Sequence, residues 1–333
     1  MEANTNAPAV IGVDLGGTKL MAGLFGPDDS IIARDRVEVT GLDSDRVVAA
    51  LVDVVNGLVA GSTTPVEAVG FGIPTTIDQR TGTAVMAANL PIANLPLRDI
   101  LTERTGLTAF IDNDANVAAL AEQRLGAGAG LTDDLIMVTL GTGFGGGIIA
   151  GGRIVRGAIG AGAELGHMSI DYDGPPCVAP NCPGIGCIET FVSGSALARD
   201  AAAYASANPD SPLARAVAAG EPARGELVLR LAKEGDAGSV ALLERLGERL
   251  GVALANFVNM FNPGMIALGG GLTPALDIVL PVARRLMVER ALPPGNEYVQ
   301  VVPAAYGPDA GMVGAALMAR DGLLDLATAT ATA

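Results

Sequence analysis

The chain has no tryptophan, a single histidine and only three cysteines. Three cysteines in 333 residues are too few for a disulfide framework, and they fit a reducing compartment. Residues 1–8 also lack the basic segment and the apolar run of a secretory signal. We therefore expect a cytoplasmic protein.

Basic residues are scarce as well, because 21 lysines and arginines stand against 36 aspartates and glutamates, a formal net charge of −15. Nucleic-acid backbones and anionic membrane surfaces repel such a chain, so neither is expected as the main partner. One uncharged run, residues 135–152, reaches the lower length limit of a membrane span. Seven of its residues are glycines, so it predicts two strands joined by a loop and no membrane segment.

The length favours about two domains, each large enough for its own core. Half of the residues are hydrophobic, so disorder is not expected outside the ends. Apolar patterns predict strands at 10–13, 20–25, 68–73, 108–112, 135–140, 147–150 and 265–268. They predict helices at 47–59, 117–124, 194–204, 225–232 and 240–261. Residues 327–333 repeat Ala-Thr without an apolar face and are expected to fray.

Both halves of the chain open with the same unit, a strand, a glycine-rich turn and a second strand. This repetition suggests an α/β architecture of two lobes around a cleft. We expect a small lobe from residues 1–115, to which 306–328 return, and a large lobe from 116–305. The hinge is expected near 113–115.

The single histidine and all three cysteines fall in one short window. His167, Cys177, Cys182 and Cys187 form a Cys3His set, which fills a tetrahedral zinc site and leaves no position for a reacting water. Taken singly, a buried cysteine is a small hydrophobe and a lone histidine an ordinary core or surface residue. The clustering among glycines and prolines favours a structural zinc ion, although the spacing differs from that of common zinc fingers.

Residues 14–19, Asp-Leu-Gly-Gly-Thr-Lys, are a candidate phosphate-binding turn. The glycines expose backbone N–H groups to anionic oxygens, and Thr18 and Lys19 add donors. Asp14, at the end of the strand, is placed to orient a magnesium-bound water. A plain hairpin turn with an exposed lysine explains the same residues equally well.

The second glycine turn formally matches a dinucleotide fingerprint through Gly141, Gly143 and Gly146. That fingerprint requires a following helix, whereas a strand is predicted here, so a phosphate-binding hairpin with Thr142 and Gly143 as donors is favoured. Residues 269–271, three glycines after a strand, suggest close approach of a nucleoside or simply a tight turn.

Asp114 is the candidate catalytic residue. It lies at a predicted strand-to-helix junction, where aspartate is commonly only a helix cap. Asn113 or Asn116 can take the capping role, which leaves Asp114 to accept a proton from a hydroxyl group. Asn89, in Ala-Asn-Leu-Pro, has an equally good interpretation as a turn residue.

With these segments assembled, the chain resembles the ROK family of sugar kinases, specifically its bacterial glucokinases. The resemblance covers residues 10–317 and rests on motifs at 14–19, 88–91, 112–116, 140–147, 164–167 and 186–189. It implies an actin-like, ribonuclease H-like fold of two lobes that close over substrate, with zinc held by histidine and cysteine. One departure is a zinc loop three residues longer at 177–183 than the usual Cys-x-Cys-Gly, which leaves the number of ligands unchanged.

The resemblance also implies roles for individual residues. Asp114 looks like the base that activates the 6-hydroxyl of the sugar, and His167 is expected to bind zinc with one nitrogen and face the sugar with the other. The implied sugar ligands are Asn89, Asn113, Asp114, Glu164, His167 and Glu189. The implied contacts to ATP and magnesium are Asp14, Gly16, Gly17, Thr18, Lys19, Gly141, Thr142, Gly143 and Gly270.

The expected activity is ATP-dependent phosphorylation of glucose to glucose 6-phosphate, with Mg2+ neutralising phosphate charge. N-acetylmannosamine, N-acetylglucosamine, mannose or fructose stay open as alternative acceptors, ADP and polyphosphate as alternative donors, and a non-catalytic sugar sensor as a different class. A DNA-binding repressor is disfavoured by the acidic composition and by only 13 residues before Asp14. A dimer or tetramer is implied by the resemblance alone.

Overall fold

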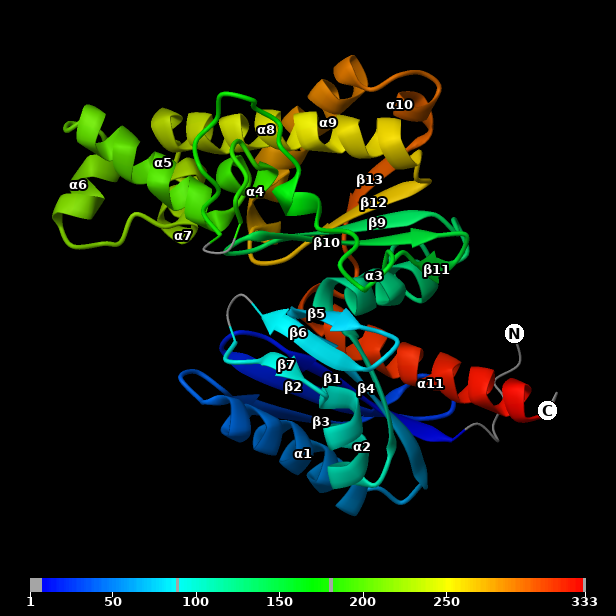
Figure 1. The fold of residues 1–333 in the computed structure, drawn as a ribbon. Coiled ribbons are helices and arrows are strands. Elements are labelled where there is room, and N and C mark those ends of the chain that lie inside the picture. The colour runs from blue at the N-terminus through cyan, green and yellow to red at the C-terminus, as the bar shows by residue number, and fades with distance from the viewer. Residues whose placement is uncertain (1–7, 88–89, 180–181, 332–333) are drawn as a thin grey trace. The chain divides into compact units, whose positions relative to one another are not determined.

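The computed structural model describes residues 8–87, 90–179 and 182–331 (Figure 1). The chain divides into two compact units, which are described separately below. The first comprises Met1–Gly130, Gly147–Ala163 and Ala305–Ala333, and the second comprises Leu131–Gly146 and Glu164–Ala304. Helices and strands are interspersed along the whole chain, which confirms the predicted α/β class.

The main sheet of the first unit has five strands in the order β3-β2-β1-β4-β8. β1 (Ala9–Leu15), β2 (Lys19–Phe25) and β3 (Ile31–Glu38) are successive antiparallel neighbours. β4 (Val66–Ile73) and β8 (Thr108–Asn113) extend the sheet on the other side of β1, and both run parallel to it. The hairpin predicted at 10–25 and the strands predicted at 68–73 and 108–112 are confirmed.

Helix α1 (Ser44–Ala60) supplies much of the core beneath this sheet (Figure 1). It begins where the Asp43 side chain accepts a hydrogen bond from the backbone N–H of Arg46, as an N-cap does. Its buried residues recur at helical spacing and are Val47, Val48, Leu51, Val52, Val54, Val55 and Leu58. The predicted helix at 47–59 is confirmed, and α2 (Leu97–Thr105), which was not predicted, adds Leu97 and Leu101 to the same core.

Helix α11 (Ala310–Ala331) lies against β1 and β4, at positions where the strands carry glycine (Figure 1). A Cβ atom at Gly70 would collide with the carbonyl of Ala315, so no larger residue fits between strand and helix. Helix α3 (Asp114–Arg124) packs on α11 in the same way, because a Cβ at Gly314 would collide with the carbonyl of Val117. These glycines let α11 pack closely on the sheet and let α3 pack closely on α11.

The expected fraying at 327–333 is wrong for residues 327–331, because α11 continues to Ala331. Alanine is the best helix former, and the threonine hydroxyls find acceptors inside the helix. Thr328 Oγ1 donates to the carbonyl of Leu324 and Thr330 Oγ1 to that of Leu326, both at 2.8 Å.

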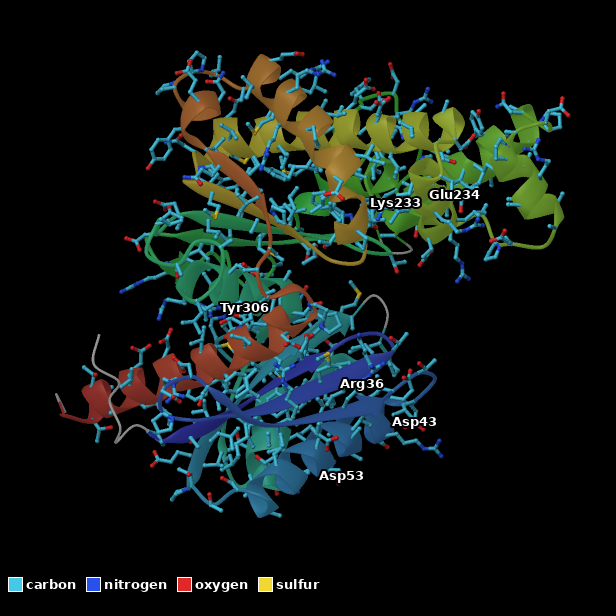
Figure 2. All side chains as sticks on the ribbon, turned by 180° about the vertical axis from the view of Figure 1, so that it is seen from behind. Arg36, Asp43, Asp53, Lys233, Glu234 and Tyr306 are labelled. Carbon is cyan, nitrogen blue, oxygen red and sulfur yellow. The ribbon has the colours of Figure 1, made fainter. Side chains whose placement is uncertain are left out.

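Glu122, a fully buried carboxylate in α3, forms hydrogen bonds with the backbone of the segment that precedes α11. It accepts hydrogen bonds from the backbone N–H groups of Ala127, Ala305 and Tyr306, at 3.0, 2.9 and 2.7 Å (Tyr306 is labelled in Figure 2). Three charge-assisted hydrogen bonds offset the burial of the charge. No local pattern in the sequence predicts this link, since its ends are more than 180 residues apart.

A smaller antiparallel sheet in the first unit follows directly after β4. It consists of β5 (Thr75–Asp78), β6 (Thr83–Ala87) and β7 (Ala93–Leu95). Its strands are too short for a clear alternation, and they were not predicted. Pro74 separates β4 from β5 and ends the longer strand as expected.

The second five-stranded sheet has the order β11-β10-β9-β12-β13. β12 (Met265–Gly269) runs parallel to β9 (Leu135–Leu140) and β13 (Gln300–Pro303), while β11 (Arg153–Ile154) is antiparallel to β10 (Phe144–Ala150). The second strand of the hairpin therefore begins at Phe144 and not at the predicted residue 147. The glycines at its start serve packing: a Cβ at Gly146 would lie 2.5 Å from the Leu165 side chain.

The described residues of the second unit form seven α-helices: α4 (Ile188–Phe191), α5 (Gly194–Ala207), α6 (Pro212–Ala218), α7 (Gly225–Lys233), α8 (Ala237–Phe261), α9 (Leu276–Arg290) and α10 (Gly295–Tyr298). The three predicted helices correspond to α5, α7 and α8. α8 and α9 approach closely because a Cβ at Gly247 would lie 2.6 Å from the Val279 carbonyl. Of the helices among the described residues, none is both long and apolar enough to cross a bilayer.

Candidate active site

Two of the predicted site residues meet at the carboxyl ends of the parallel strands in the first unit. Asp14 on β1 is paired with Gly72 on β4, and Gly72 is paired with Asp112 on β8. A Cβ at Gly72 would lie 3.5 Å from Asp114 Cα and 3.7 Å from Asp14 Oδ1. Asp14 and Asp114 therefore flank one glycine at the edge of the sheet where α/β proteins commonly bind ligands.

Asp114 is the first residue of α3, and Asn113 is its N-cap. Asn113 Oδ1 accepts from the backbone N–H groups of Ala115 and Asn116, at 2.9 and 3.4 Å, which confirms that Asn113 can cap. Asp114 Oδ1 also accepts from the N–H of Ala115 at 2.9 Å. The predicted helix start at residue 117 is wrong by three residues, and the earlier start places the Asp114 carboxylate where the helix dipole favours negative charge.

Asp112 is almost fully buried and was predicted only as part of a motif, without a role of its own. Its Oδ1 accepts from the N–H of Asn113 at 2.7 Å and from Asn116 Nδ2 at 2.9 Å. Its Oδ2 accepts from Nε of Arg156 at 2.6 Å. A charged residue at the end of a buried strand is a signal that can be read from sequence, but its partner 44 positions away is not.

The Asp14 carboxyl is unusual in its ionisation. Burial, and after it the charge of Asp114, raises its pKa to about 7, while Lys19 lowers it. The start of α11 crowds the same group, because a Cβ at Gly311 would collide with the Asp14 carboxylate. Gly311 is a site residue that the sequence did not reveal, since an Ala-Gly-Met step at a helix start has no special pattern.

The first glycine turn joins β1 to β2 as a tight hairpin closed by a 2.8 Å hydrogen bond from Gly16 N–H to the Lys19 carbonyl. Gly17 and Thr18 are exposed. Within the described part of the chain, no acceptor takes a hydrogen bond from the N–H group of Gly17 or Thr18. Two exposed residues whose N–H groups have no acceptor among the described residues can donate to an anion, so the turn is compatible with phosphate binding.

The second glycine turn, residues 141–143, is held by the start of α5. The N–H of Gly194 donates to the Gly141 carbonyl at 2.8 Å, and Ser195 Oγ donates to the Thr142 carbonyl at 2.9 Å. A strand follows the turn, so the dinucleotide fingerprint is excluded as predicted. Gly270, with φ of +92°, closes on β9, where a Cβ would lie 2.5 Å from the Leu140 carbonyl.

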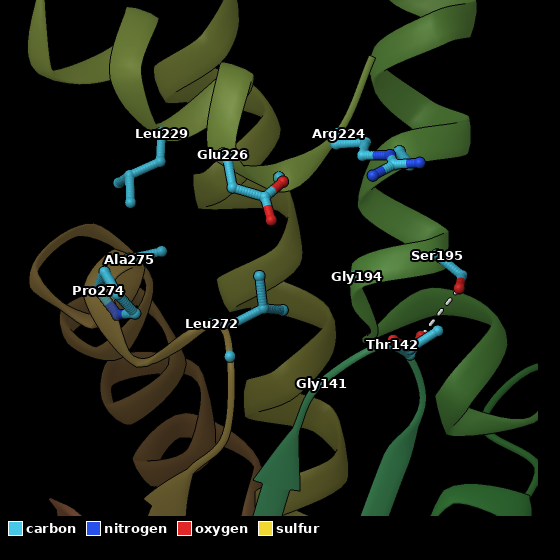
Figure 3. A pocket seen from close by; sticks show the side chains of 13 residues that line it. Gly141, Thr142, Gly194, Ser195, Arg224, Glu226, Leu229, Leu272, Pro274 and Ala275 are labelled. Carbon is cyan, nitrogen blue, oxygen red and sulfur yellow. Dashed lines mark hydrogen bonds between the residues drawn. The ribbon is translucent and has the colours of Figure 1, made fainter. Parts of the chain in front are cut away.

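A cavity of about 550 Å³ opens beside this turn in the second unit (Figure 3). Its size lies in the usual range of small-molecule sites. Figure 3 shows Thr142 and Ser195 on one side of the cavity and Glu226 and Leu272 on the other. Its lining also includes Gly141, Gly194, Arg224, Leu229, Gly271, Pro274 and Ala275. Apart from the glycines at 141 and 271 and Thr142, this lining was not predicted.

Glu189 and Gly166 both lie against Phe144, the first residue of β10. Glu189 Oε2 accepts from the N–H of Phe144 at 2.8 Å, and a Cβ at Gly143 would collide with the same carboxylate. Glu164 precedes the short helix η1 (Leu165–His167) and His167 is its last residue, with Glu164 Oε2 4.0 Å from His167 Nε2. Asn89, the remaining predicted sugar ligand, lies outside the described residues.

The four candidate metal ligands come together in the second unit. The ligand atoms of His167, Cys177, Cys182 and Cys187 all lie within 4.8 Å of one another. Cys177 Sγ is 3.6 Å from His167 Nδ1, and Cys182 Sγ is 3.8 Å from Cys187 Sγ. Ligands around one tetrahedral zinc ion are about 3.5–3.8 Å apart, so the donor set and these two distances fit such a site. The longer loop at 177–183 has not displaced a ligand.

Comparison with known proteins shows the family of the chain. Residues 10–322 match the ROK family. The chain is 33% identical to a glucokinase of Thermotoga maritima over 316 residues, which cover 94% of this chain and 97% of that protein. The chain belongs to the ROK family.

Two further similarities are to kinases of different sugars. The crystal structure of a ROK family glucokinase from Streptomyces griseus in complex with glucose and AMPPNP matches with a TM-score of 0.80 and 35% identity, covering 94% of this chain and 99% of that one. An N-acetyl-D-glucosamine kinase of Photobacterium profundum is 31% identical, covering 92% of this chain and 98% of that protein. The resemblance to ROK glucokinases and the actin-like α/β fold are thus confirmed, whereas the relatives act on more than one sugar.

Proposed function

We propose that this ROK protein is an ATP-dependent glucokinase that phosphorylates the 6-hydroxyl of glucose. The observation that carries the proposal is the placement of Asp114 as the first residue of α3, close to Asp14. Asn113 caps this helix. A carboxylate fixed at this position is suited to accept the proton of an attacking hydroxyl group. Similarity to glucokinases over more than 90% of the chain supports glucose as the acceptor.

In this proposal the first unit contributes the base. Asp114 takes the hydroxyl proton as the sugar oxygen attacks the terminal phosphorus of the nucleotide, and the bond from that phosphorus to the bridging oxygen breaks to release ADP. Asn113 and Asn89 hold sugar hydroxyl groups. Phosphoryl transfer needs little covalent help from the protein, so the rate depends on the position of Asp114 and on charge stabilisation.

The second unit contributes sugar and nucleotide ligands. Glu164, His167 and Glu189 bind sugar hydroxyls, and His167 Nδ1 faces the cysteines while Nε2 is directed towards Glu164. The glycine turn at 141–143 binds phosphate, with Gly270 beside it, and the 550 Å³ cavity receives the nucleoside. A cavity of this size favours a nucleotide donor over polyphosphate, which has no base to place there.

Two metals complete the proposal. Magnesium bound with the nucleotide supplies neutralisation of phosphate charge, and Asp14 is the residue placed to orient its water, with Gly16, Gly17, Thr18 and Lys19 as phosphate donors. Zinc bound by His167, Cys177, Cys182 and Cys187 is structural, because four protein ligands leave no open position. Its role is to hold the loop and the orientation of the His167 ring.

A matrix of donors and acceptors tests the proposal on purified, zinc-loaded protein. ATP, ADP and polyphosphate are each combined with glucose, N-acetylglucosamine, N-acetylmannosamine, mannose and fructose, and phosphorylated sugar is measured directly. The highest kcat/KM is expected for ATP with glucose. Preference for an N-acetylated sugar would replace glucose as the acceptor, and absence of turnover with every pair would reject the kinase and favour a sugar sensor.

A further inference from the structure

The residue that stands out beyond the predicted site is Arg156. Its Nε atom donates to Oδ2 of Asp112 at 2.6 Å, and the two side chains are 33% and 2% exposed. Asp112 is thus a charge enclosed in the protein with one cationic partner among the described residues. Removing one member of a buried ion pair leaves the other charge uncompensated, which makes the pair sensitive to substitution.

Asp112 in turn organises the segment that carries the proposed base. Its Oδ1 accepts from the N–H of Asn113 and from the side-chain amide of Asn116. Asn113 caps α3, whose first residue is Asp114. Arg156 holds Oδ2, so it fixes the carboxylate orientation in which Oδ1 meets both asparagines.

The backbone around Arg156 is itself held firmly. The N–H of Gly162 donates to the Arg156 carbonyl at 2.9 Å. Gly160, with φ of +82°, packs so closely on β5 that a Cβ there would collide with the Ile77 carbonyl. Only glycine is comfortable at such a φ, so this loop is built to dock on the sheet. The loop backbone that carries Arg156 is therefore held in place, which fixes the side chain beside Asp112.

We propose that Arg156 is a positioning residue for the phosphoryl transfer: it acts through Asp112 to set the Asn113 cap and the Asp114 carboxylate, without touching substrate. This role rests on the proposed kinase function. A general base misplaced by about 1 Å can lose about 10²-fold in rate, so an ion pair that orients the segment before Asp114 matters for catalysis as well as for folding.

The test compares Arg156→Gln, Arg156→Lys and Arg153→Ala with the wild type, well below the melting temperature of every variant. Arg156→Gln is expected to lower kcat by about 10- to 100-fold and to leave the KM for ATP within about 2-fold. Arg156→Lys is expected to recover much of the rate, because only Nε contacts Asp112 and a lysine ammonium can supply one charged donor. Arg153, exposed on β11 and without an ion pair to any described residue, is the matched control and should behave as wild type.

A double-mutant cycle with Asp112→Asn separates positioning through Asp112 from a general loss of structure. Asn at 112 keeps an Oδ1 acceptor for both asparagines but no longer needs a cation. Arg156→Gln in the Asp112→Asn background is therefore expected to cost much less in kcat than in the wild type, as coupled residues do.

Three results would overturn the role. A lower melting temperature for Arg156→Gln with unchanged kcat would make Arg156 purely structural. Additive losses in the cycle would show that it does not act through Asp112. If the wild type turned over no hexose, the kinase proposal itself would fall, and the positioning role with it.

Discussion

The Asp14 and Asp114 carboxylates lie at the same edge of one sheet, and the charge of Asp114 is one reason why Asp14 holds its proton unusually tightly. Burial is the larger cause, and together they raise the pKa of Asp14 to about 7 from 3.8. A buried carboxyl with so high a pKa destabilises the folded protein when it is ionised. Such groups are characteristic of functional sites.

The raised pKa predicts a pH-dependent effect of Asp14→Asn on stability in the absence of ligands. Between pH 4 and pH 7 the native state binds the proton that the unfolded state has lost, so the wild type loses stability as pH rises through this window. Asparagine carries no charge at any pH. At pH 8 the variant is expected to be more stable by about 1–4 kcal/mol, and below pH 4 the difference should vanish.

Urea unfolding at several pH values measures this difference. Asp53→Asn is the control, because Asp53 lies exposed on the outer side of α1 (Figure 2). A variant that is equally stable relative to wild type at pH 4 and pH 8 would contradict the raised pKa. Despite its stability, Asp14→Asn should lose activity if Asp14 orients the magnesium-bound water.

Gly311→Ala is expected to impair catalysis by pushing on Asp14, since the added methyl group would overlap the carboxylate. The expected loss in kcat/KM for ATP is about 10- to 100-fold, with glucose affinity little changed when measured by calorimetry. Gly57→Ala in α1 is the control, because a Cβ there meets nothing within 4 Å and should only stabilise the helix. Equal activity of the two variants would show that the start of α11 is free to move away.

Much of the fold was predictable because its signals are local. The glycine turns at 16–19 and 141–143 interrupt apolar runs, and α1 has a regular apolar face, so strands and helix follow from neighbouring residues. The errors arose where a residue serves a distant contact. The glycines at the start of β10 suggested a loop, but they make room for Leu165. The Ala-Thr tail was expected to fray, but it continues a helix whose first half is buried.

The candidate site likewise contains residues with a signal in the sequence and residues without one. The metal ligands stood out because the chain has one histidine and three cysteines, so their clustering was visible without a structure. Arg156, Gly311 and Glu226 carried no such signal. Arg156 reaches Asp112 across 44 positions, Gly311 matters only because Asp14 lies against it, and Glu226 lines a cavity assembled from several helices.

The zinc proposal predicts that purified protein carries about one zinc ion per chain by elemental analysis. Cys182→Ser removes one of four ligands and should lose the metal and lower the melting temperature by at least about 5 °C, since coordination energy contributes to folding. Val178→Ser, an exposed position in the same loop, should keep both. Full stability and activity of the metal-free Cys182→Ser protein would leave zinc without a structural role.

The central claim is that Asp114 deprotonates the sugar hydroxyl, and the most direct test measures kcat and glucose affinity for Asp114→Asn. Asparagine preserves the size and the hydrogen-bonding oxygen but cannot accept the proton, so kcat is expected to fall by at least about 10²-fold while calorimetry still detects glucose binding. Asp99→Asn, an exposed aspartate in the first turn of α2, is the matched control and should retain full activity. An Asp114→Asn protein that phosphorylates glucose at the wild-type rate would contradict the account.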